Sequence, residues 1–177
     1  MNQEELEACI QAYGRDIYSF CLQLTKSRQE ADDLYQDTFL KIVEIRERLD
    51  FKSNPKGYLL SVCVNLWRNR RRKFAWRQRI VGPELRMDDT DTAWEPPSGE
   101  ASVEEQMISR EERGLVQKAV DDLPEKYRMP VLLFYMEELK ISEISGILKI
   151  PAGTVKSRLY KAKKALEKKL EVVLNEK

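Results

Sequence analysis

Two clusters of basic side chains are the parts of this 177-residue chain best suited to bind a charged partner. Residues 68–79 carry seven basic and no acidic side chains and are interleaved with Phe74 and Trp76, directly after Trp67. Residues 156–169 carry seven basic side chains and a single acidic one. Cations bind phosphates and aromatic rings can stack on bases, so the two clusters together indicate nucleic-acid binding. Either cluster alone is also compatible with a solvated helix face.

The clusters lie in different segments, which the net charge of +1 conceals. Residues 1–81 hold 15 basic and 11 acidic side chains, residues 82–105 hold 1 and 8, and residues 106–177 hold 15 and 11. The middle segment contains several Pro and Gly residues and lacks a helical period, which predicts a flexible acidic linker. We therefore expect two small domains, 1–81 and 106–177, joined by the linker 82–105. A metal site in the linker is the alternative interpretation of its aspartates, which we expect to be solvated instead. These aspartates are Asp88, Asp89 and Asp91.

The composition disfavours several classes of protein. The longest stretch without a charged side chain, 57–67, is shorter than the ~18 or more residues that a membrane-spanning helix needs. No basic residue precedes Arg15, unlike the start of a secretory signal, so we expect a cytoplasmic protein. The chain has no His and no CxxC spacing, which argues against a metal site, a cofactor and an enzyme. The cysteines are expected to be small core residues; they are Cys9, Cys21 and Cys63.

The apolar residues recur at helical spacing along the chain, which predicts an all-α fold. Before the linker, helices are expected from about residue 6 to 24, over about 31–42, and from about Gly57 into the first basic cluster. The segment 50–57 is expected to be a turn with an exposed aromatic residue. The inner face of the first helix is expected to hold Leu6, Ile10, Ile17, Phe20, Cys21 and Leu24. After the linker, helices are expected at about 102–121, 124–137, 142–149 and from 151 to the C-terminus.

The second basic cluster lies in a pattern typical of a helix-turn-helix. A short predicted helix is followed by a tight turn at 150–154 and then by the basic helix. At 100° per residue the basic helix has a narrow apolar stripe of Val155, Leu159, Ala162 and Leu166, and its opposite face is polar and basic. A recognition helix presents such a face to the major groove of DNA. An ordinary amphipathic surface helix has the same period and remains the alternative.

Several motifs follow one another in a fixed order. The chain reads ADDLYQDTF at 31–39, LPEKYR at 123–128, SEI at 142–144 and IPAGTVKSRL at 150–159. The first motif resembles region 2.2 of bacterial RNA polymerase sigma factors, and the other three resemble their region 4. The stretch 51–73 is similar to regions 2.3 and 2.4. The resemblance covers nearly the whole chain outside the linker, is specific in the order and spacing of its motifs, and fits the ECF (extracytoplasmic-function) class best.

Three residues depart from the family's pattern. Ser145 stands where the family usually has Ala, and Gly146 stands where it usually has a longer side chain. Pro130 is expected to interrupt its helix. Gly146 is expected to weaken its helix by up to ~1 kcal/mol relative to Ala.

The resemblance implies a sigma factor with two small helical domains, region 2 and region 4. Such a protein binds core RNA polymerase, reads the minus-10 and minus-35 promoter elements and opens the promoter, while the polymerase catalyses the reaction. The acidic linker would thread through the polymerase toward the active centre and the RNA exit path. Core RNA polymerase and promoter DNA are thus the expected partners, and an anti-sigma factor is left open as a further one. No small-molecule substrate and no membrane insertion are expected.

The resemblance also assigns residues to each surface. The expected polymerase-binding residues are Asp33, Gln36, Asp37 and Leu40. The expected minus-10 residues are Phe51, Ser53, Asn54, Lys56, Tyr58, Asn65, Arg68 and Arg71, while Trp67 is expected mainly to pack. The expected minus-35 residues are Thr154, Lys156, Ser157, Arg158, Tyr160, Lys161, Lys163 and Lys164. Within the last group, Lys156, Ser157, Tyr160 and Lys161 are expected to read bases and the others to hold phosphates.

Two other functions compete with this interpretation. A conventional helix-turn-helix regulator would bind as a dimer to paired half-sites. The first domain argues against it, because a helix with Asp33, Gln36 and Asp37 and a basic aromatic helix make little sense in a ligand sensor. A nucleic-acid-processing enzyme would need a cluster of carboxylates for a metal ion. The paired acids here lie instead on the docking-like helix or in the linker.

Overall fold

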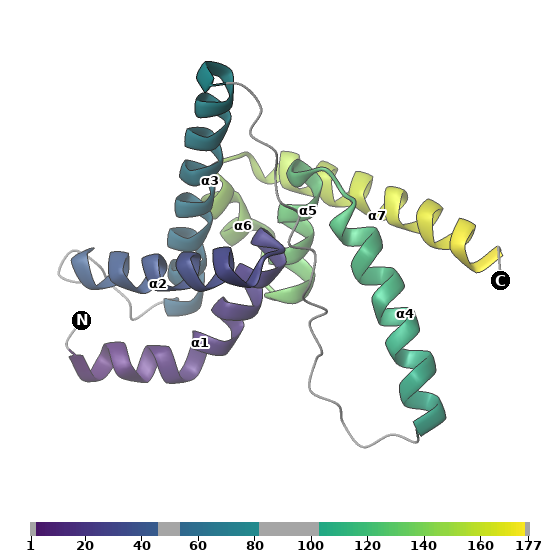
Figure 1. Cartoon of the computed structure of the whole chain (residues 1–177), viewed down its shortest axis with the longest axis horizontal. Coiled ribbons are helices and arrows are strands. Elements are labelled where there is room, and N and C mark those ends of the chain that lie inside the picture. The colour runs from purple at the N-terminus through teal and green to yellow at the C-terminus, as the bar shows by residue number, and fades with distance from the viewer. Residues whose placement is uncertain (1–2, 46–53, 82–102, 176–177) are drawn as a thin grey trace. The chain divides into compact units, whose positions relative to one another are not determined.

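The computed structural model of the chain describes residues 3–45, 54–81 and 103–175, and every regular element within these ranges is a helix. The all-α prediction is therefore confirmed. Phe51, Ser53 and the linker aspartates lie outside the described residues. The described elements form two compact units, one built around α1, α2 and α3 and the other around α4, α5, η2 and α7 (Figure 1).

The first unit is a bundle of α1 (Gln3–Thr25), α2 (Arg28–Ile45) and α3 (Pro55–Val81). Each pair of these helices is in contact, and the fully buried side chains come from all three. They include Ile17, Phe20, Leu24, Leu34, Ile42, Leu59, Leu60 and Val64. The cysteines are core residues as predicted: all are buried and free, and Cys21 Sγ lies 3.6 Å from Cys63 Sγ.

The connection between α1 and α2 is a tight turn. Lys26 has a positive φ of 59°, and Ser27 acts as the N-cap residue of α2, where its Oγ accepts a hydrogen bond from Glu30 N at 3.4 Å. Along α1 the expected inner face is confirmed at Ile17, Phe20, Cys21 and Leu24, which are buried. Leu6 is half-buried, and Ile10 is 37% exposed while Cys9 is buried. The expectation for Ile10 was wrong because it assumed a straight helix, whereas α1 changes direction along its length (Figure 1).

Helix α3 begins two residues earlier than the turn chemistry predicted. Asn54 is its N-cap, with Oδ1 accepting a hydrogen bond from Gly57 N at 2.9 Å, and Pro55 occupies the first helical position. Gly57 is buried, and a Cβ atom there would approach Asn54 Nδ2 to 2.6 Å. The turn expected over 50–57 therefore ends earlier than predicted, because residues 55–57 belong to α3.

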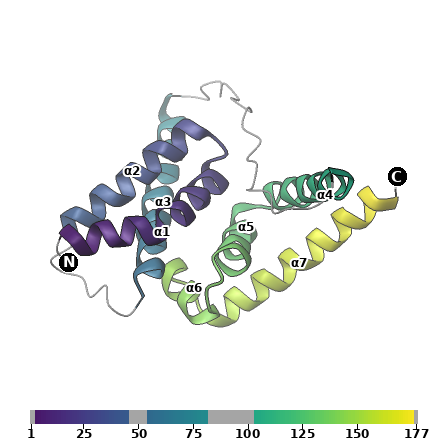
Figure 2. The same cartoon turned by 90° about the horizontal axis from the view of Figure 1, so that it is seen from below.

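The second unit contains α4 (Val103–Asp121), α5 (Glu125–Val131), the π-helix η2 (Leu132–Met136) and α7 (Ala152–Asn175). Helices α4 and α5 both contact α7 (Figure 2). Their core is formed by Leu123, Val131 and Ala162, with Val120, Tyr127, Leu159, Ala165 and Leu166 packed around it. Helix α4 starts within the segment predicted as linker, so the boundary expected at residue 105 falls inside a helix.

Pro130 does not break its helix, contrary to the expectation. It lacks the N–H that would donate to the carbonyl of Lys126, yet α5 continues through it to Val131. The chain then adopts the wider π geometry, in which Glu137 N donates to Leu132 O at 3.1 Å. The predicted helix over 124–137 is therefore present, but as two segments with different hydrogen bonding.

Candidate nucleic-acid and partner interfaces

The helix-turn-helix pattern folds as the sequence predicts. Helix α6 spans Ile141–Leu148, includes Gly146, and is followed by a turn at Lys149, which has a positive φ of 53°. Ile150 N donates to Ser145 O at 3.2 Å, and the Ser145 hydroxyl donates to Ile150 O at 2.6 Å. The departure at Ser145 thus has a structural use, because its hydroxyl satisfies a carbonyl of the turn.

Helix α7 has the two faces that its period predicts. Val155 and Ala162 are completely buried. The opposite face is exposed and consists of Lys156, Ser157, Tyr160, Lys161 and Lys164. Lys163 is also exposed, while Thr154 and Arg158 at the edges are half-buried. The arrangement places a basic surface on the side of α7 that the core does not use.

Several groups on α7 have partners within the protein. The Ser157 hydroxyl donates to Thr154 O at 3.0 Å, which leaves its oxygen as an acceptor. The ammonium groups of Lys163 and Lys164 lie 3.9 and 3.5 Å from the carboxylate of Glu167. Exposed pairs of this kind are weak, so they restrain the two lysines only slightly.

The outer side of α2 is a second exposed surface. Asp33, Gln36, Asp37 and Leu40 are all exposed, and Leu40 is 62% accessible, which is high for a large apolar side chain. We call these four residues the docking face. Asp37 Oδ2 accepts a hydrogen bond from the guanidinium of Arg70 at 2.5 Å, which connects the docking face with α3. Sequence spacing cannot predict this pair, because its members are 33 residues apart.

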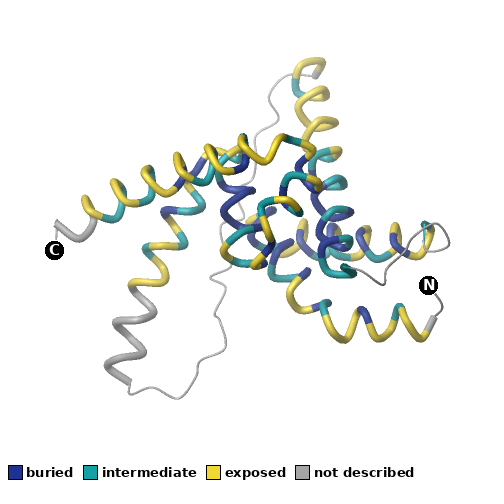
Figure 3. The backbone as a smooth tube through the Cα atoms, turned by 180° about the vertical axis from the view of Figure 1, so that it is seen from behind, coloured by how far each residue is buried: buried dark blue, intermediate teal, exposed yellow. Residues whose placement is uncertain are grey.

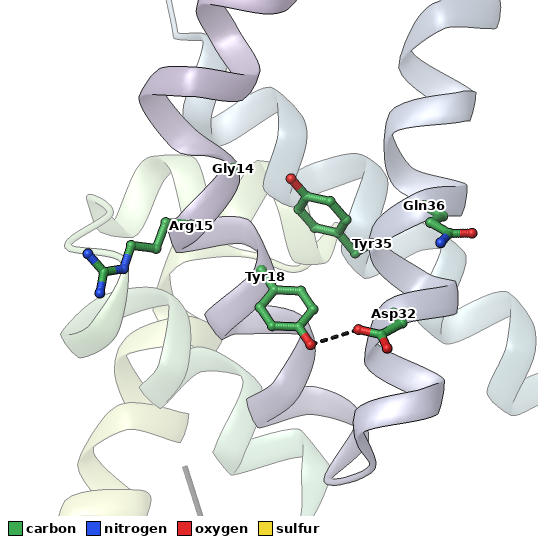
Figure 4. Close-up of a pocket in the computed structure, with 6 residues that line it drawn as sticks. All are labelled: Gly14, Arg15, Tyr18, Asp32, Tyr35 and Gln36. Atoms are coloured by element: carbon green, nitrogen blue, oxygen red, sulfur yellow. Dashed lines mark hydrogen bonds between the residues drawn. The ribbon is translucent and has the colours of Figure 1, made fainter. Parts of the chain in front are cut away.

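A shallow groove of about 440 Å³ lies between α1 and α2 beside the docking face. Tyr18 and Tyr35 form its centre, with their rings nearly perpendicular at 5.5 Å, and the Tyr18 hydroxyl donates to Asp32 Oδ1 at 2.7 Å (Figure 4). This hydrogen bond and burial raise the pKa of Tyr18, and burial raises that of Tyr35. Both tyrosines therefore stay neutral at physiological pH. Their mutual contact and the bond to Asp32 hold α1 against α2.

The start of α3 contains the described part of the predicted minus-10 surface. Asn54 is the helix cap, and the Lys56 ammonium lies 3.0 Å from Asp16 of α1, so both residues have structural roles that the sequence did not reveal. Tyr58, Asn65 and Arg68 are half-buried along α3, and Arg71 is exposed. Trp67 packs as predicted: it is 6% exposed and lies under the Arg71 guanidinium, 5.7 Å from the ring centroid.

The described ranges contain no helix long and apolar enough to cross a membrane. Within the same ranges, no group of three or more His, Cys, Asp or Glu side chains is arranged to hold a metal ion.

Comparison with known families and proteins identifies both units. A family model described as "Sigma-70 region 2" matches residues 9–78, and one described as "Sigma-70, region 4" matches residues 113–166. The sigma-E factor of Salmonella typhimurium, an ECF RNA polymerase sigma factor, is 35% identical over 149 residues, which is 82% of this chain and 76% of that protein. The ECF factor SigW of Bacillus subtilis is 27% identical and matches 96% of this chain and 90% of its own length.

Solved structures show the same fold. The sigma factor RpoE from Bartonella quintana, solved with the anti-sigma factor NepR, aligns with a TM-score of 0.71 at 22% identity and covers 96% of both chains. CnrH, solved with the cytosolic domain of CnrY, aligns with a TM-score of 0.67 at 16% identity and covers 97% of this chain and 90% of its own. Taken with the two matched regions and the sequence relatives, these similarities show that the chain belongs to the ECF family of RNA polymerase sigma factors.

Proposed function

We propose that this ECF sigma factor uses three separate helix faces: the docking face of α2 for core polymerase, α3 for the minus-10 element and α7 for the minus-35 element. As a member of its family it directs promoter-specific transcription initiation with core RNA polymerase. In this proposal region 2 comprises residues 1–81, region 4 comprises 106–177, and 82–105 connect them. The protein itself catalyses no covalent step and acts in the cytoplasm.

The observation that carries the proposal is the basic face of α7, which lies opposite the completely buried residues Val155 and Ala162 and directly after the turn that joins α6 to α7. Reconstitution of the full chain with purified core polymerase tests the proposal. Transcripts that start at defined promoters only when the chain is present are expected. A dimeric footprint on DNA without polymerase would favour a conventional regulator instead.

The docking face is the proposed polymerase contact. Leu40 supplies apolar area, and Asp33, Gln36 and Asp37 supply polar specificity around it, which is the usual composition of an interface centre and its rim. The variant Leu40→Ser should weaken association with core polymerase while leaving the helical circular dichroism unchanged, because the side chain is exposed. Unchanged affinity would remove Leu40 from the interface.

Asp37 needs a matched control because it also pairs with Arg70. The variant Asp37→Asn should weaken polymerase binding if the carboxylate contacts the polymerase directly. The control Arg70→Gln breaks the same ion pair but keeps the carboxylate. Equal losses in the two variants would show that the pair, and not a direct contact of Asp37, matters for docking.

On α7, Lys156, Ser157, Tyr160 and Lys161 are proposed to read bases, and Arg158, Lys163 and Lys164 to hold phosphates together with Thr154. The exposed lysines near the helix start are best placed to reach base edges, while those farther along lie where a straight helix leaves the groove. Lys156→Ala should reduce discrimination against the wrong base at one or two base pairs, by about 1–3 kcal/mol of binding free energy. Lys163→Ala should weaken binding to all sequences alike. It should also lower, by about one, the slope of the logarithm of the binding constant against the logarithm of the salt concentration.

Affinity measurements for every single-base variant of the minus-35 element, at two salt concentrations, distinguish these roles. A uniform loss across all sequences for Lys156→Ala would assign that residue to the phosphates.

For the minus-10 element, the proposed contacts of the described residues are made by Tyr58, Asn65, Arg68 and Arg71 along α3. Arg71 is exposed above Trp67, so its guanidinium can bind a phosphate while the buried indole fixes its position. Arg71→Gln should weaken binding of a single-stranded minus-10 oligonucleotide by the holoenzyme. Asn54, Lys56, Phe51 and Ser53 remain proposed contacts, although Asn54 and Lys56 also stabilise the fold. Unaltered affinity of the Arg71→Gln holoenzyme would exclude this phosphate contact.

An anti-sigma factor is a further proposed partner, because RpoE and CnrH were both solved in complex with a protein partner. Affinity capture of the full chain from its own cells, followed by mass spectrometry, tests this. The expected result is a partner that competes with core polymerase, and a partner that binds without such competition would argue against an anti-sigma role.

A further inference from the structure

The core of the first unit contains two thiols side by side. Cys21 of α1 and Cys63 of α3 are completely buried, and their Sγ atoms lie 3.6 Å apart although the residues are 42 positions apart in the sequence. The buried residues of α3 lie between 57 and 67, so Cys63 is in the packed part of that helix (Figure 3). The third cysteine, Cys9, lies elsewhere on α1 and is also buried. The thiol pair therefore lies where α1 meets α3.

The separation of the two sulfur atoms suits the formation of a disulfide. The thiols already contact each other through a hydrogen bond in which either sulfur can be the donor. An S–S bond is about 2.05 Å long, so the sulfur atoms need to approach each other by only about 1.5 Å. Rotation of the side chains and a small shift of one helix can supply a movement of this size. The folded protein thus holds the two thiols ready to be joined.

Oxidation of one thiol alone would damage this core. Hydrogen peroxide converts a cysteine thiolate to a sulfenic acid, and more peroxide converts that to a sulfinic acid, which dithiols do not reduce. The residues next to the pair in the sequence, Phe20 and Val64, are completely buried, and an ionised sulfinate among such side chains is costly. A neighbouring thiol prevents this step, because it condenses with the sulfenic acid to a disulfide that other thiols can reduce.

We propose that Cys21 and Cys63 are a reversible oxidation site, at which peroxide converts the two thiols to a disulfide. Because both side chains are buried, peroxide reaches them when the contact between α1 and α3 opens transiently. One thiolate attacks a peroxide oxygen and breaks the O–O bond, which gives a sulfenic acid and a hydroxide ion. The second thiolate then attacks the sulfenic sulfur, forms the S–S bond and displaces a second hydroxide ion.

The reaction is balanced by the protons of the two thiols, which neutralise the two hydroxide ions. Two thiols and one hydrogen peroxide thus give one disulfide and two water molecules, and the peroxide is the species that is reduced. The new bond ties α1 to α3 and keeps the first unit folded. Thiols of a reducing cytoplasm then restore the original pair, so the protein recovers from an oxidising episode.

Peptide mapping of the full chain tests the proposal directly. Trypsin cleaves after Lys and Arg, so Cys9, Cys21 and Cys63 fall in the separate peptides 1–15, 16–26 and 57–68. The full chain is treated with hydrogen peroxide, its remaining thiols are blocked with N-ethylmaleimide in denaturant, and the peptides are analysed by mass spectrometry without reduction. A cross-link between peptides 16–26 and 57–68 is expected, together with a maleimide on peptide 1–15. Dithiothreitol should convert the cross-link back to two thiol peptides.

Two variants test whether the second thiol protects the first. In Cys63→Ala, Cys21 lacks its neighbour and should accumulate as a sulfinic acid that dithiothreitol does not reverse. The matched control Cys9→Ala keeps the pair and should form the same cross-link as wild type. Helical circular dichroism of each variant is measured before oxidation. If Cys63→Ala has lost helix content, Cys63→Ser takes its place, since serine is closer to cysteine in shape.

Thermal unfolding gives a readout that does not depend on a variant. The oxidised wild-type protein should melt about 8 °C or more above the reduced protein, because a link between residues 42 apart restricts the unfolded chain. An equal or lower melting temperature would contradict a disulfide that fits the fold.

The mapping has clear outcomes against the proposal. Wild-type thiols that stay unmodified under peroxide would show that the pair is an inert part of the core. Cross-links to Cys9 or to a second chain would assign the oxidation to unfolded protein. Full recovery of Cys21 in the Cys63→Ala protein would also overturn the proposal, because the second thiol would then give no protection.

Discussion

Replacing Asn54 with alanine should destabilise the unit of α1, α2 and α3 through the loss of one helix cap. Asn54 Oδ1 accepts a hydrogen bond from Gly57 N at 2.9 Å, and Gly57 is buried. Loss of an N-cap costs about 0.5–2 kcal/mol, and the upper half of that range applies when the donor left behind is buried. For a domain of about 80 residues this corresponds to a melting temperature lower by about 4–16 °C.

Trp67 provides a local probe for this measurement because it is buried in the same unit. In a background with Trp76→Phe and Trp94→Phe, its fluorescence during urea titration reports the unfolding of that unit alone. The matched control is Asn54→Asp, which keeps an acceptor oxygen at the cap and should retain wild-type stability. Its added negative charge should nevertheless weaken DNA binding if the residue lies close to phosphates.

The two variants thus separate the cap from a contact with DNA. An Asn54→Ala protein with the same urea midpoint and slope as wild type would refute the capping argument. If both variants lose promoter opening while only the alanine variant loses stability, Asn54 has both roles.

Three further predictions concern the hydrogen bond between Tyr18 and Asp32 and the core of the second unit. Tyr18→Phe removes the hydrogen bond to Asp32 and should lower the free energy of unfolding by about 1 kcal/mol at neutral pH. Because the folded state raises the pKa of Tyr18, its contribution is complete below about pH 10 and is lost at higher pH. Denaturation at several alkaline pH values should therefore show a smaller decline for Tyr18→Phe than for wild type, and parallel declines would contradict it. Ala162→Leu should overpack the core of the second unit and lower its free energy of unfolding by roughly 1–3 kcal/mol. Urea unfolding measures this loss. The control Lys164→Leu, on the exposed face, should change stability by less than about 0.5 kcal/mol, and equal losses would show that α7 is packed differently.

Periodicity was the most reliable guide to the fold. The stripe through Val155 and Ala162 was predicted correctly because a helix repeats every 3.6 residues whatever it packs against. The same method failed for Ile10, since a periodic projection does not register a change in helix direction. The expected interruption at Pro130 did not come from periodicity, and it was wrong because α5 continues through Pro130 and is followed directly by the π-helix η2.

The site residues were harder to interpret from sequence. The resemblance assigned the docking face, and its four residues are exposed on α2. The partners of Asn54 and Arg70 could not be predicted, because a cap looks like any polar loop residue and an ion pair across two helices has no signature in sequence spacing. Polar residues near a predicted binding loop were therefore all assigned to DNA. The structure shows that some of them hold the helix in place.

The turns between the helices contain positions at which a substitution should increase the stability of the protein. Among the described residues, the non-glycine positions with positive φ are Lys26, Glu138 and Lys149, and each follows a helix. A left-handed backbone costs a residue with a Cβ atom roughly 1–2 kcal/mol, which glycine avoids at the expense of a more disordered unfolded chain. Glycine at these three positions is therefore a route to a more heat-resistant sigma factor. None of the three belongs to the surfaces proposed for polymerase or DNA, so thermal tolerance can be engineered separately from promoter choice.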